Sequence, residues 1–337
     1  MSGMNGRVVC FGELLLRLAA PDRGHLFQTA RLDAHFGGAE ANVAVALARI
    51  GVPASVVTSL PHGPVGDAAL ETVRAAGVDV GGVRRADGRL GLYYFSPPSG
   101  PRGAHIVYDR LDSVFATAAA DAYDWPRLLD GAAWLHLSGI IPAIGPGAAA
   151  LSLAAIAAAR AAGVGVSFDG NFRASMWARW CADPAPILID HVAQADLLIG
   201  NHRDIALLLK EPHDGDTPEA RRRAALAAFA RFPALRTIAS TDRRVVDADT
   251  HRLSARIDRR DDAFETDPVT VGGIVDRIGT GDAYAAGVLA GIATGPERAA
   301  RTGLALAALK HATLGDHSRS TAADIAAFST AATDVRR

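Results

Sequence analysis

Short runs rich in β-branched residues alternate with longer Ala- and Leu-rich segments along most of this chain, and this alternation restricts the possible folds more than any other feature. Buried strands separated by helices are typical of a parallel sheet that is covered on both faces. We predict strands at 7–12, 55–60, 133–138, 164–169, 197–200 and 237–240. Helices are predicted at 40–50, 67–76, 147–161, 185–193, 217–232, 282–293 and 296–311.

Two segments, at about 14–36 and 90–110, have strand character without an intervening helix. The second of them indicates a hairpin around a Pro/Gly-rich turn at 97–101. Strands added to an α/β sheet in this way often form a lid over a ligand crevice. Because no Ser/Gly-rich linker, low-complexity tract or repeat divides the chain, we predict a single domain over residues 1–337 with a small β-strand lid.

The charge balance excludes several classes of partner. Lys plus Arg number 35 and Asp plus Glu 36, so no cationic excess is available to hold nucleic acid or an anionic membrane. The apolar stretch at 8–18 is interrupted by Glu13 and Arg17, and no segment approaches the roughly 20 apolar residues of a membrane span. With only two cysteines, a reducing, cytoplasmic location is expected, and a small molecule is the expected partner.

The segment 276–282, Asp-Arg-Ile-Gly-Thr-Gly-Asp, carries the clearest signal for chemistry. Gly279 and Gly281 permit a sharp turn that leaves backbone N–H groups unpaired at the start of a helix, where a phosphate can bind. Asp282 lies beside those groups, where its carboxylate can accept a proton from a hydroxyl. We expect the helix N-terminus to lower the pKa of Asp282. An N-capping role is the simpler structural explanation, but Asp276 upstream and the small-residue helix downstream favour function.

This segment resembles the D-x-x-G-A-G-D signature of the PfkB/ribokinase family of carbohydrate kinases, with Thr280 in place of Ala. Residues 37–44, Gly-Gly-Ala-Glu-Ala-Asn-Val-Ala, resemble the first signature of that family, in which a glycine pair and an Asn face the sugar. The resemblance extends from about residue 8 to 316. It implies a ribokinase-like three-layer α/β/α fold with a mainly parallel central sheet, and the use of ATP with Mg²⁺.

Further segments are similar to the group of this family that phosphorylates 2-keto-3-deoxygluconate. They are Asp-Gly-Asn-Phe-Arg at 169–173 with Trp177, Tyr-Asp-Arg at 108–110, and Lys-His-Ala-Thr-Leu-Gly-Asp at 310–316. The resemblance implies that the sugar acid contacts Gly38, Asn42, Tyr93, Tyr108, Arg110, Arg173, Asp282 and Asp316. It places Asn171, Arg173, Asn201 and Gly279–Gly281 on the nucleotide side.

The arginines give separate, residue-level support for an acidic substrate. Arg110 and Arg173 each offer a planar fork that matches a carboxylate or a phosphate. Arg17 follows the first strand, where an Arg suits an anion better than a neutral polyol. The alternative for each is a solvated or ion-paired arginine without a substrate role.

Three positions depart from the family pattern. The carboxylate of the N-x-x-E motif is Asp204 in Asn201-His-Arg-Asp204, so we predict a contact with Mg²⁺ through water. The T-x-G-x-x-G loop is replaced by Ser-Thr-Asp-Arg-Arg-Val-Val at 240–246, in which Ser240, Thr241 and Arg243 can still bond phosphates; of these, Ser240 is predicted as a nucleotide contact. The hydroxyl of Thr280 either donates to a phosphate or crowds the anion site.

Together these features predict an ATP-dependent kinase that converts 2-keto-3-deoxygluconate to 2-keto-3-deoxy-6-phosphogluconate. Asp282 is the predicted base, the 279–281 backbone the anion site, and Arg173 a further catalytic group. Two alternatives stay open: a kinase of a neutral sugar such as fructose or a ribose-like sugar, and a catalytically silent sensor of sugar acids. A homodimer formed through the lid strands is also predicted.

Overall fold

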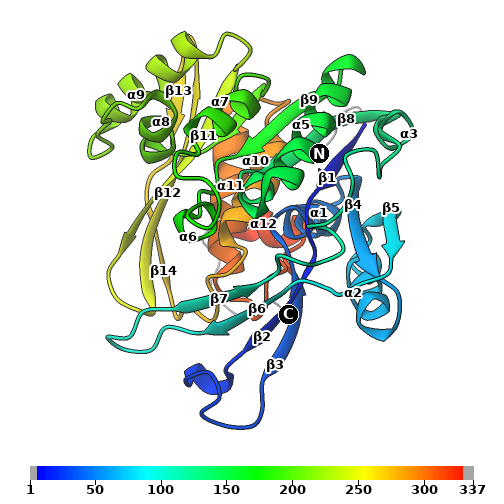
Figure 1. Ribbon diagram of the computed structural model, residues 1–337. Helices are drawn as coiled ribbons and strands as arrows, with labels where there is room; N and C mark the ends of the chain where they lie inside the picture. The colour runs from blue at the N-terminus through cyan, green and yellow to red at the C-terminus, as the bar shows by residue number, and fades with distance from the viewer. Residues whose placement is uncertain (1–5, 329–337) are drawn as a thin grey trace.

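The computed structural model describes residues 6–328, and two sheets organise this part of the chain (Figure 1). The larger sheet is built from β1 Arg7–Phe11, β4 Ala54–Pro61, β5 Asp79–Ala86, β8 Ala132–Ser138, β9 Gly165–Asp169, β10 Leu197–Ile199, β11 Thr237–Val245, β12 Thr250–Arg259, β13 Ala263–Glu265 and β14 Val269–Gly272. Its order is β13-β12-β11-β10-β9-β8-β1-β4-β5, with β14 also paired to β12. The strands from β11 to β5 are parallel, whereas β12 to β14 pair antiparallel.

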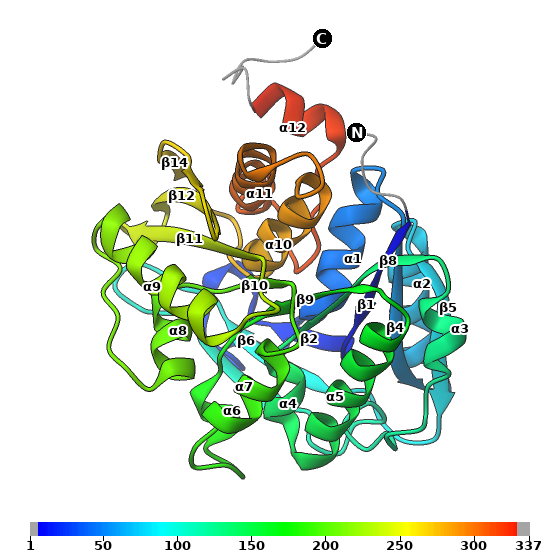
Figure 2. The ribbon, with the colours of Figure 1, turned by 90° about the horizontal axis from the view of Figure 1, so that it is seen from above.

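Helices cover both faces of this sheet (Figure 2). One layer contains α1 Ala39–Arg49, α2 Pro64–Ala75, α10 Thr280–Gly291, α11 Pro296–Lys310 and α12 Ala322–Phe328. The other contains α3 Trp125–Leu129, α4 Ile140–Ile144, α5 Pro146–Ala161, α6 Ala174–Trp177, α7 Ala185–Val192, α8 His202–Leu209 and α9 Pro218–Arg231. The predicted three-layer α/β/α arrangement with a mainly parallel sheet is therefore confirmed.

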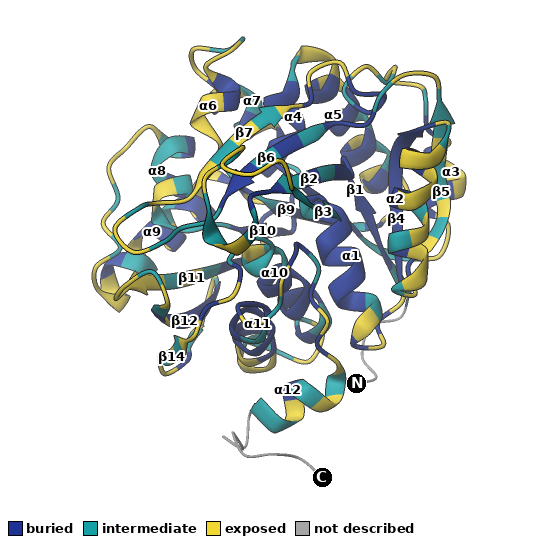
Figure 3. Cartoon of the chain, turned by 90° about the horizontal axis from the view of Figure 1, so that it is seen from below, coloured by how far each residue is buried: buried dark blue, intermediate teal, exposed yellow. Residues whose placement is uncertain are grey.

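The central strands separate two hydrophobic cores. Successive side chains of a strand point to opposite faces, so Val8 and Cys10 of β1 pack into one core while Val9 and Phe11 pack into the other. Figure 3 shows the buried residues concentrated along this sheet and the inner sides of its helices. Within residues 6–328 no helix has both the length and the apolar character needed to cross a membrane.

A second, four-stranded sheet forms the predicted lid (Figure 1). It consists of β2 Leu15–Ala19, β3 Asp33–Gly37, β6 Leu92–Ser96 and β7 His105–Asp109, in the order β3-β2-β6-β7. β2 pairs parallel with β6, and the other pairs are antiparallel. Both segments that broke the strand–helix alternation therefore meet in one sheet.

Several elements were not predicted. β5, with the sequence Asp-Val-Gly-Gly-Val-Arg-Arg-Ala, is an edge strand whose glycines and arginines hide its strand character. β12 reads Thr-His-Arg-Leu-Ser-Ala-Arg-Ile-Asp-Arg, and pairing with β11, together with burial under α11, makes it a strand. The segment between 241 and 275 is therefore β-structure that extends the sheet beyond its parallel part.

Candidate active site

Three cavities adjoin one another at the carboxyl ends of the parallel strands, where α/β proteins commonly bind ligands. The lid cavity, of about 320 Å³, lies under the lid and includes Tyr93, Tyr108 and Asp282. The middle cavity, of about 530 Å³, is lined by residues that include Asp169 and Asp204. The far cavity, of about 350 Å³, lies between α8, β11 and α10 and includes Asn201, Ser240 and Tyr284. Gly281 lines all three, so the first turn of α10 is their meeting point.

The first turn of α10 depends on two glycines for different reasons. Gly279 is the N-cap with φ 79°, a left-handed backbone conformation that favours glycine, and a Cβ there would collide with the carbonyl oxygen of Asp316. Gly281 has helical neighbours and open space around it, since nothing lies within 4 Å of the position of a Cβ. One glycine is thus required by the fold, and the other leaves room for a ligand.

Backbone donors at this turn are unpaired. In the described part of the chain the N–H groups of Gly281 and Asp282 have no hydrogen-bond acceptor. The N–H and the hydroxyl of Thr280 both point to the carbonyl oxygen of Arg277, at 3.4 and 3.0 Å. The Thr280 hydroxyl therefore supports the turn rather than donating to a ligand. Two unpaired N–H groups at the positive end of a helix dipole are suited to bind an anion.

The carboxylate of Asp282 is held in the lid cavity by the N-terminal glycine segment. Asn42 Nδ2 donates to Asp282 Oδ2 at 2.6 Å, and Gly38 N–H donates to Asn42 Oδ1 at 3.3 Å. Burial raises the pKa of Asp282 to about 6; the Asn42 hydrogen bond opposes this rise and the charge of Asp316 adds to it. The expected lowering of this pKa by the helix N-terminus is wrong, because removal from water outweighs the dipole.

Asp316 also lines the lid cavity but is tied to the lid. Arg17 Nη1 lies 3.0 Å from Asp316 Oδ1 and 2.7 Å from Asp276 Oδ2, and the Tyr93 hydroxyl donates to Asp316 Oδ2. The Arg17 side chain is 1% exposed. With two carboxylate partners it is neutralised, so the expectation that Arg17 meets an anionic substrate is wrong. It joins β2 to the segments on either side of α10 and α11.

Arg110 reaches the lid cavity in a similarly paired state. Its Nε and Nη2 lie 2.6 and 2.5 Å from Glu13 Oε2, and the Ser113 hydroxyl donates to the same carboxylate. The rings of Tyr93 and Tyr108 stand side by side with their centroids 6.2 Å apart. The structure brings these predicted substrate residues together, but the charge of Arg110 is largely offset.

Arg173 differs from Arg110 because it has no carboxylate within ion-pair distance in the described part of the chain. Its Nη1 donates only to the neighbouring carbonyl of Phe172, at 3.2 Å. Arg173 and Asn171 line both the lid cavity and the middle cavity. Asn171 has φ 37°, an uncommon backbone conformation for a residue other than glycine. Arg173 therefore borders both of the cavities that its predicted bridging role would connect.

The predicted nucleotide-side residues surround the far and middle cavities. Asn201 and Asp204 cap α8 reciprocally: Asn201 Oδ1 accepts from Arg203 N–H, and Asp204 Oδ2 accepts from Asn201 N–H, both at 2.8 Å. Asn201 and Ser240 line both cavities, and Asp204 lines the middle one. Asn201 is therefore the N-cap of α8, as the structural alternative predicted, and it also lies at the edge of the cavity.

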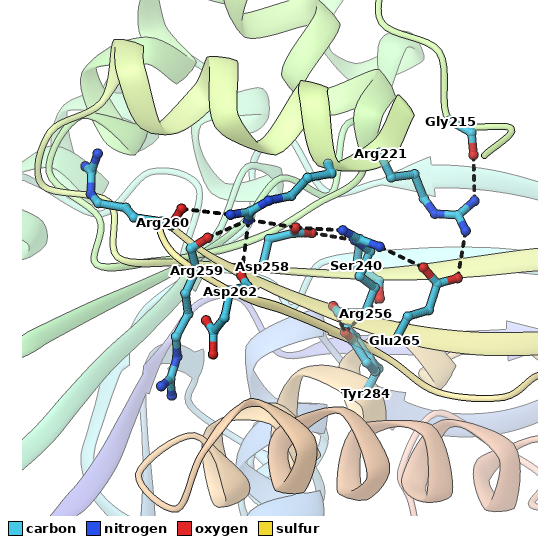
Figure 4. A network of polar contacts seen from close by, with 11 residues as sticks. Gly215, Arg221, Ser240, Arg256, Asp258, Arg259, Arg260, Asp262, Glu265 and Tyr284 are labelled. Atoms are coloured by element: carbon cyan, nitrogen blue, oxygen red, sulfur yellow. Dashed lines mark hydrogen bonds and ion pairs between the residues drawn. The ribbon is translucent and has the colours of Figure 1, made fainter. Parts of the chain in front are cut away.

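A partly buried ionic network borders the far cavity through Arg221 and Asp258 (Figure 4). Arg256 pairs with Asp258 at 2.7 Å and with Glu265 at 2.9 Å, and Arg221 pairs with Glu265 at 2.6 Å. The Tyr284 hydroxyl of α10 donates to the Ser240 carbonyl at 2.8 Å. This bond links the helix that begins at the anion site to the strand on the other side of the far cavity.

Two carboxylates at the site were not assigned a role from the sequence. Asp169 ends β9 and lines the lid and middle cavities, and burial, with the charge of Asp282 adding, raises its pKa well above the ordinary value. Glu13 follows β1 and holds Arg110. The signal available for both was their place at the carboxyl end of a predicted parallel strand.

Comparisons with known proteins agree with this geometry. The model of the pfkB family carbohydrate kinases matches residues 5–322. A 2-dehydro-3-deoxygalactonokinase of Haloferax volcanii is 33% identical over 93% of each chain, and a 2-dehydro-3-deoxygluconokinase of Bacillus subtilis is 28% identical over 91% of this chain and 90% of its own length. The crystal structure of a 2-dehydro-3-deoxygluconokinase from Thermotoga maritima superposes with a TM-score of 0.92 at 33% identity, covering 97% of this chain and 98% of the other.

The resemblance noted at the two glycine signatures is therefore confirmed over nearly the whole chain, and the fold is ribokinase-like. A family match of this extent, together with a relative at 33% identity over most of both chains, establishes the class of enzyme. This protein is a carbohydrate kinase that belongs to the pfkB family.

Proposed function

We propose that this kinase uses ATP to phosphorylate 2-keto-3-deoxygluconate at its 6-hydroxyl and releases 2-keto-3-deoxy-6-phosphogluconate. One observation carries the proposal. The free N–H groups of Gly281 and Asp282 and the Asp282 carboxylate lie on the same helix turn, where the three cavities meet. Relatives named for 2-dehydro-3-deoxy sugar acids support this substrate class.

The chemical step needs an anion site and a proton acceptor on the same helix turn. The 6-hydroxyl oxygen attacks the γ-phosphorus, the bond from that phosphorus to the bridging oxygen breaks, and ADP leaves. Asp282 accepts the hydroxyl proton, while the N–H groups at 281 and 282 stabilise charge on the transferred phosphoryl group. A pKa of about 6 keeps Asp282 ionised at neutral pH and makes it a better base than an ordinary carboxylate.

The sugar acid would lie in the lid cavity. Gly38, Asn42 and Asp316 border the reacting end, and Tyr93 and Tyr108 form the wall under the lid. Arg173, which lacks a carboxylate partner in the described residues, is the cation best placed for the substrate carboxylate or for bridging it to the nucleotide. Arg110 would add a single donor, because Glu13 holds the rest of its guanidinium.

ATP would occupy the far and middle cavities, with its phosphates directed to Gly281. Asn171, Asn201 and Ser240 border this path. The residues present also fit Mg²⁺, which proteins usually bind through one or two carboxylates with phosphates and water completing the shell. Asp204 and Asp169 both line the middle cavity, and Asp204 would make its contact through water. The ion would offset phosphate charge.

A neutral-sugar kinase is the second candidate, and a specific observation favours it. Arg17 and Arg110, two of the three arginines that indicated an acidic substrate, are both neutralised by carboxylates. The preference for an acid then depends mainly on Arg173.

A coupled assay of ADP release across a substrate panel tests the proposal. The panel contains 2-keto-3-deoxygluconate, its C4 epimer 2-keto-3-deoxygalactonate, fructose and ribose. We expect kcat/KM for the keto-deoxy acids to exceed that for the neutral sugars by about tenfold or more, the value of one good charge-assisted contact. Faster turnover of fructose or ribose would establish the second candidate, and no ADP release with any compound would indicate a silent sensor.

A further inference from the structure

The arginines around the three cavities fall into two groups. Arg110 and Arg221 have carboxylate partners at 2.5 and 2.6 Å. Within the described residues, no carboxylate oxygen lies within 4.0 Å of the guanidinium groups of the other four, and their charge is available to a ligand. These four are Arg173, Arg203, Arg243 and Arg277.

Two of the unpaired arginines face the start of α10 from different segments. Arg243 belongs to the outer half of β11 and lines both the far cavity and the lid cavity. Arg277 lines the lid cavity, and its backbone is fixed because Thr280 donates hydrogen bonds to the Arg277 carbonyl. Both line the lid cavity together with Gly281 and Asp282, and Arg243 also reaches the far cavity on the nucleotide side.

The two guanidinium groups repel one another. Arg243 is exposed at the rim of the cavity; partial desolvation by the surrounding walls lowers its pKa, and the charge of Arg277 lowers it further. The nearby His251 is fully buried, with no hydrogen-bond partner for either ring nitrogen in the described residues, and its own pKa is lowered to about 4 by burial and by these arginines. Within the described residues no carboxylate pairs with either arginine, and Asp247 only partly offsets their charge at His251, so a bound polyanion would be attracted to this cluster.

Arg243 also lies in the segment where the family's glycine loop is missing. A T-x-G-x-x-G loop would present backbone N–H groups to phosphates, whereas the strand from Ser240 to Val245 has its backbone paired with β12. This pairing engages the N–H groups of alternate residues and keeps the strand extended, so its backbone cannot wrap around a phosphate and a side chain would have to reach the phosphate from this strand. Arg243 can do so.

We propose that Arg243 and Arg277 form a two-arginine clamp on the β- and γ-phosphoryl groups of the nucleotide, replacing the glycine loop. The proposal rests on the proposed use of ATP. The clamp would add positive charge to the phosphate site at the α10 amides. Its arginines are catalytic residues in that they contact the reacting group, as arginines do in other phosphoryl transfer enzymes.

Calorimetry without any sugar separates the clamp from the choice of sugar. The ligands are MgADP, inorganic tripolyphosphate and adenosine, measured with the wild-type protein, Arg243→Gln and Arg277→Gln. Each substitution is expected to weaken MgADP and tripolyphosphate about tenfold, as loss of one charge-assisted bond predicts. Adenosine affinity should not change. Arg244→Gln is the matched control, because Arg244 is an exposed neighbour paired with Asp242 at 3.5 Å.

Thermal unfolding adds a second measurement, in which the substitutions should not destabilise the ligand-free protein although they weaken phosphate binding. Removing one of two repelling charges should leave the Tm of the ligand-free protein unchanged or higher, while the rise in Tm caused by tripolyphosphate shrinks. A parallel loss of adenosine affinity, or a lower ligand-free Tm, would show a structural role and overturn the clamp. Unchanged affinity of both variants for MgADP and tripolyphosphate would also overturn it.

The outcome is distinguishable from failure of the proposed function. Wild-type protein that binds MgADP through the clamp but phosphorylates no sugar acid contradicts the substrate and leaves the clamp standing. Wild-type protein that binds neither MgADP nor tripolyphosphate contradicts both.

Discussion

Asp282 is a carboxylate whose charged form is disfavoured by its surroundings and is required by its proposed role as the base. Burial raises its pKa to about 6, and the hydrogen bond from Asn42 limits that rise. The same contact fixes the direction of the carboxylate in the lid cavity. Asn42 therefore acts on both the position and the basicity of the proposed base.

The pH profile of kcat/KM follows from this pKa. Asp282 must be ionised to accept a proton, so activity should be constant above pH 6 and fall about tenfold per unit below it, with a midpoint near the pKa of about 6. Asn42→Ala removes a bond to the ionised form and should move the midpoint upward. A profile that stays flat down to pH 5 in both proteins would contradict this assignment.

At the level of single residues, the sequence predicted which side chains meet but not their charge state. The glycine signatures located Asn42, Gly279 and Asp282 correctly at one cavity. The partners of Arg17 and Arg110 come from Asp316, Asp276 and Glu13, and for Arg17 those partners are more than 250 positions away in the chain. The sequence around each arginine cannot predict these distant ion pairs, and the sequence around Asp282 cannot predict the burial that raises its pKa.

The beginning of α10 is the element on which the site depends, and its two glycines permit a matched test. Gly279→Ala forces an L-residue into φ 79° and against the Asp316 carbonyl, so we expect a loss of about 2 kcal/mol or more in unfolding free energy. Gly281→Ala has open space and helical geometry, so stability should be retained.

Gly281→Ala, which should keep its stability, should nevertheless lose activity. The methyl group of Gly281→Ala would project into the meeting point of the cavities, and we expect kcat/KM for ATP to fall about tenfold or more through a misplaced phosphoryl group. Differential scanning fluorimetry and the ADP-release assay measure the two effects. An active Gly281→Ala protein with ordinary kinetics would show that phosphate does not approach this turn.

Among the helices and strands, the sequence predicted best the strands that are buried along most of their length. The parallel strands β1, β4, β8 and β9 are apolar runs that need no partner to be recognised. β5 and β12 carry several charged residues, and their strand conformation comes from pairing with β4 and β11. Such edge and antiparallel strands depend on neighbours that the sequence pattern does not name.

On the scale of the molecule, two arginines join the lid to the body of the protein. Arg17 links β2 to Asp276 and Asp316, and Arg23 bonds Asp249 and the Ile274 carbonyl, both at 2.5 Å. The lid strands were predicted from their sequence, but these attachments were not. They hold the lid over the cavity in the described structure.

We predict that the outer face of the lid forms a homodimer. Val107 is 43% exposed and pairs across the strands with Tyr94, and Phe27, 69% exposed, packs on the Tyr94 ring. Light scattering with size exclusion should give twice the chain mass of 35.0 kDa. Val107→Asp should return the mass to that of one chain, because it places charge in an apolar contact. A wild-type monomer would contradict the prediction.

Asp282→Asn is the variant that isolates the proposed base, and its stability serves as the fold control. Asp282 has a raised pKa, so its ionised form costs stability above pH 6 and nothing below about pH 4, where it is protonated in both folded and unfolded chains. The neutral amide avoids that cost. The Tm of Asp282→Asn should therefore equal or exceed that of the wild type at pH 8 and match it at pH 4.

The most direct measurement is kcat of Asp282→Asn with 2-keto-3-deoxygluconate and ATP, alongside the dissociation constants of ADP and the sugar acid. We predict that kcat falls by about 10²–10⁴, the usual contribution of a general base, while both affinities stay close to those of the wild type. Turnover near the wild-type value, in a folded variant that binds both ligands, would contradict the assignment of Asp282 as the group that deprotonates the acceptor hydroxyl.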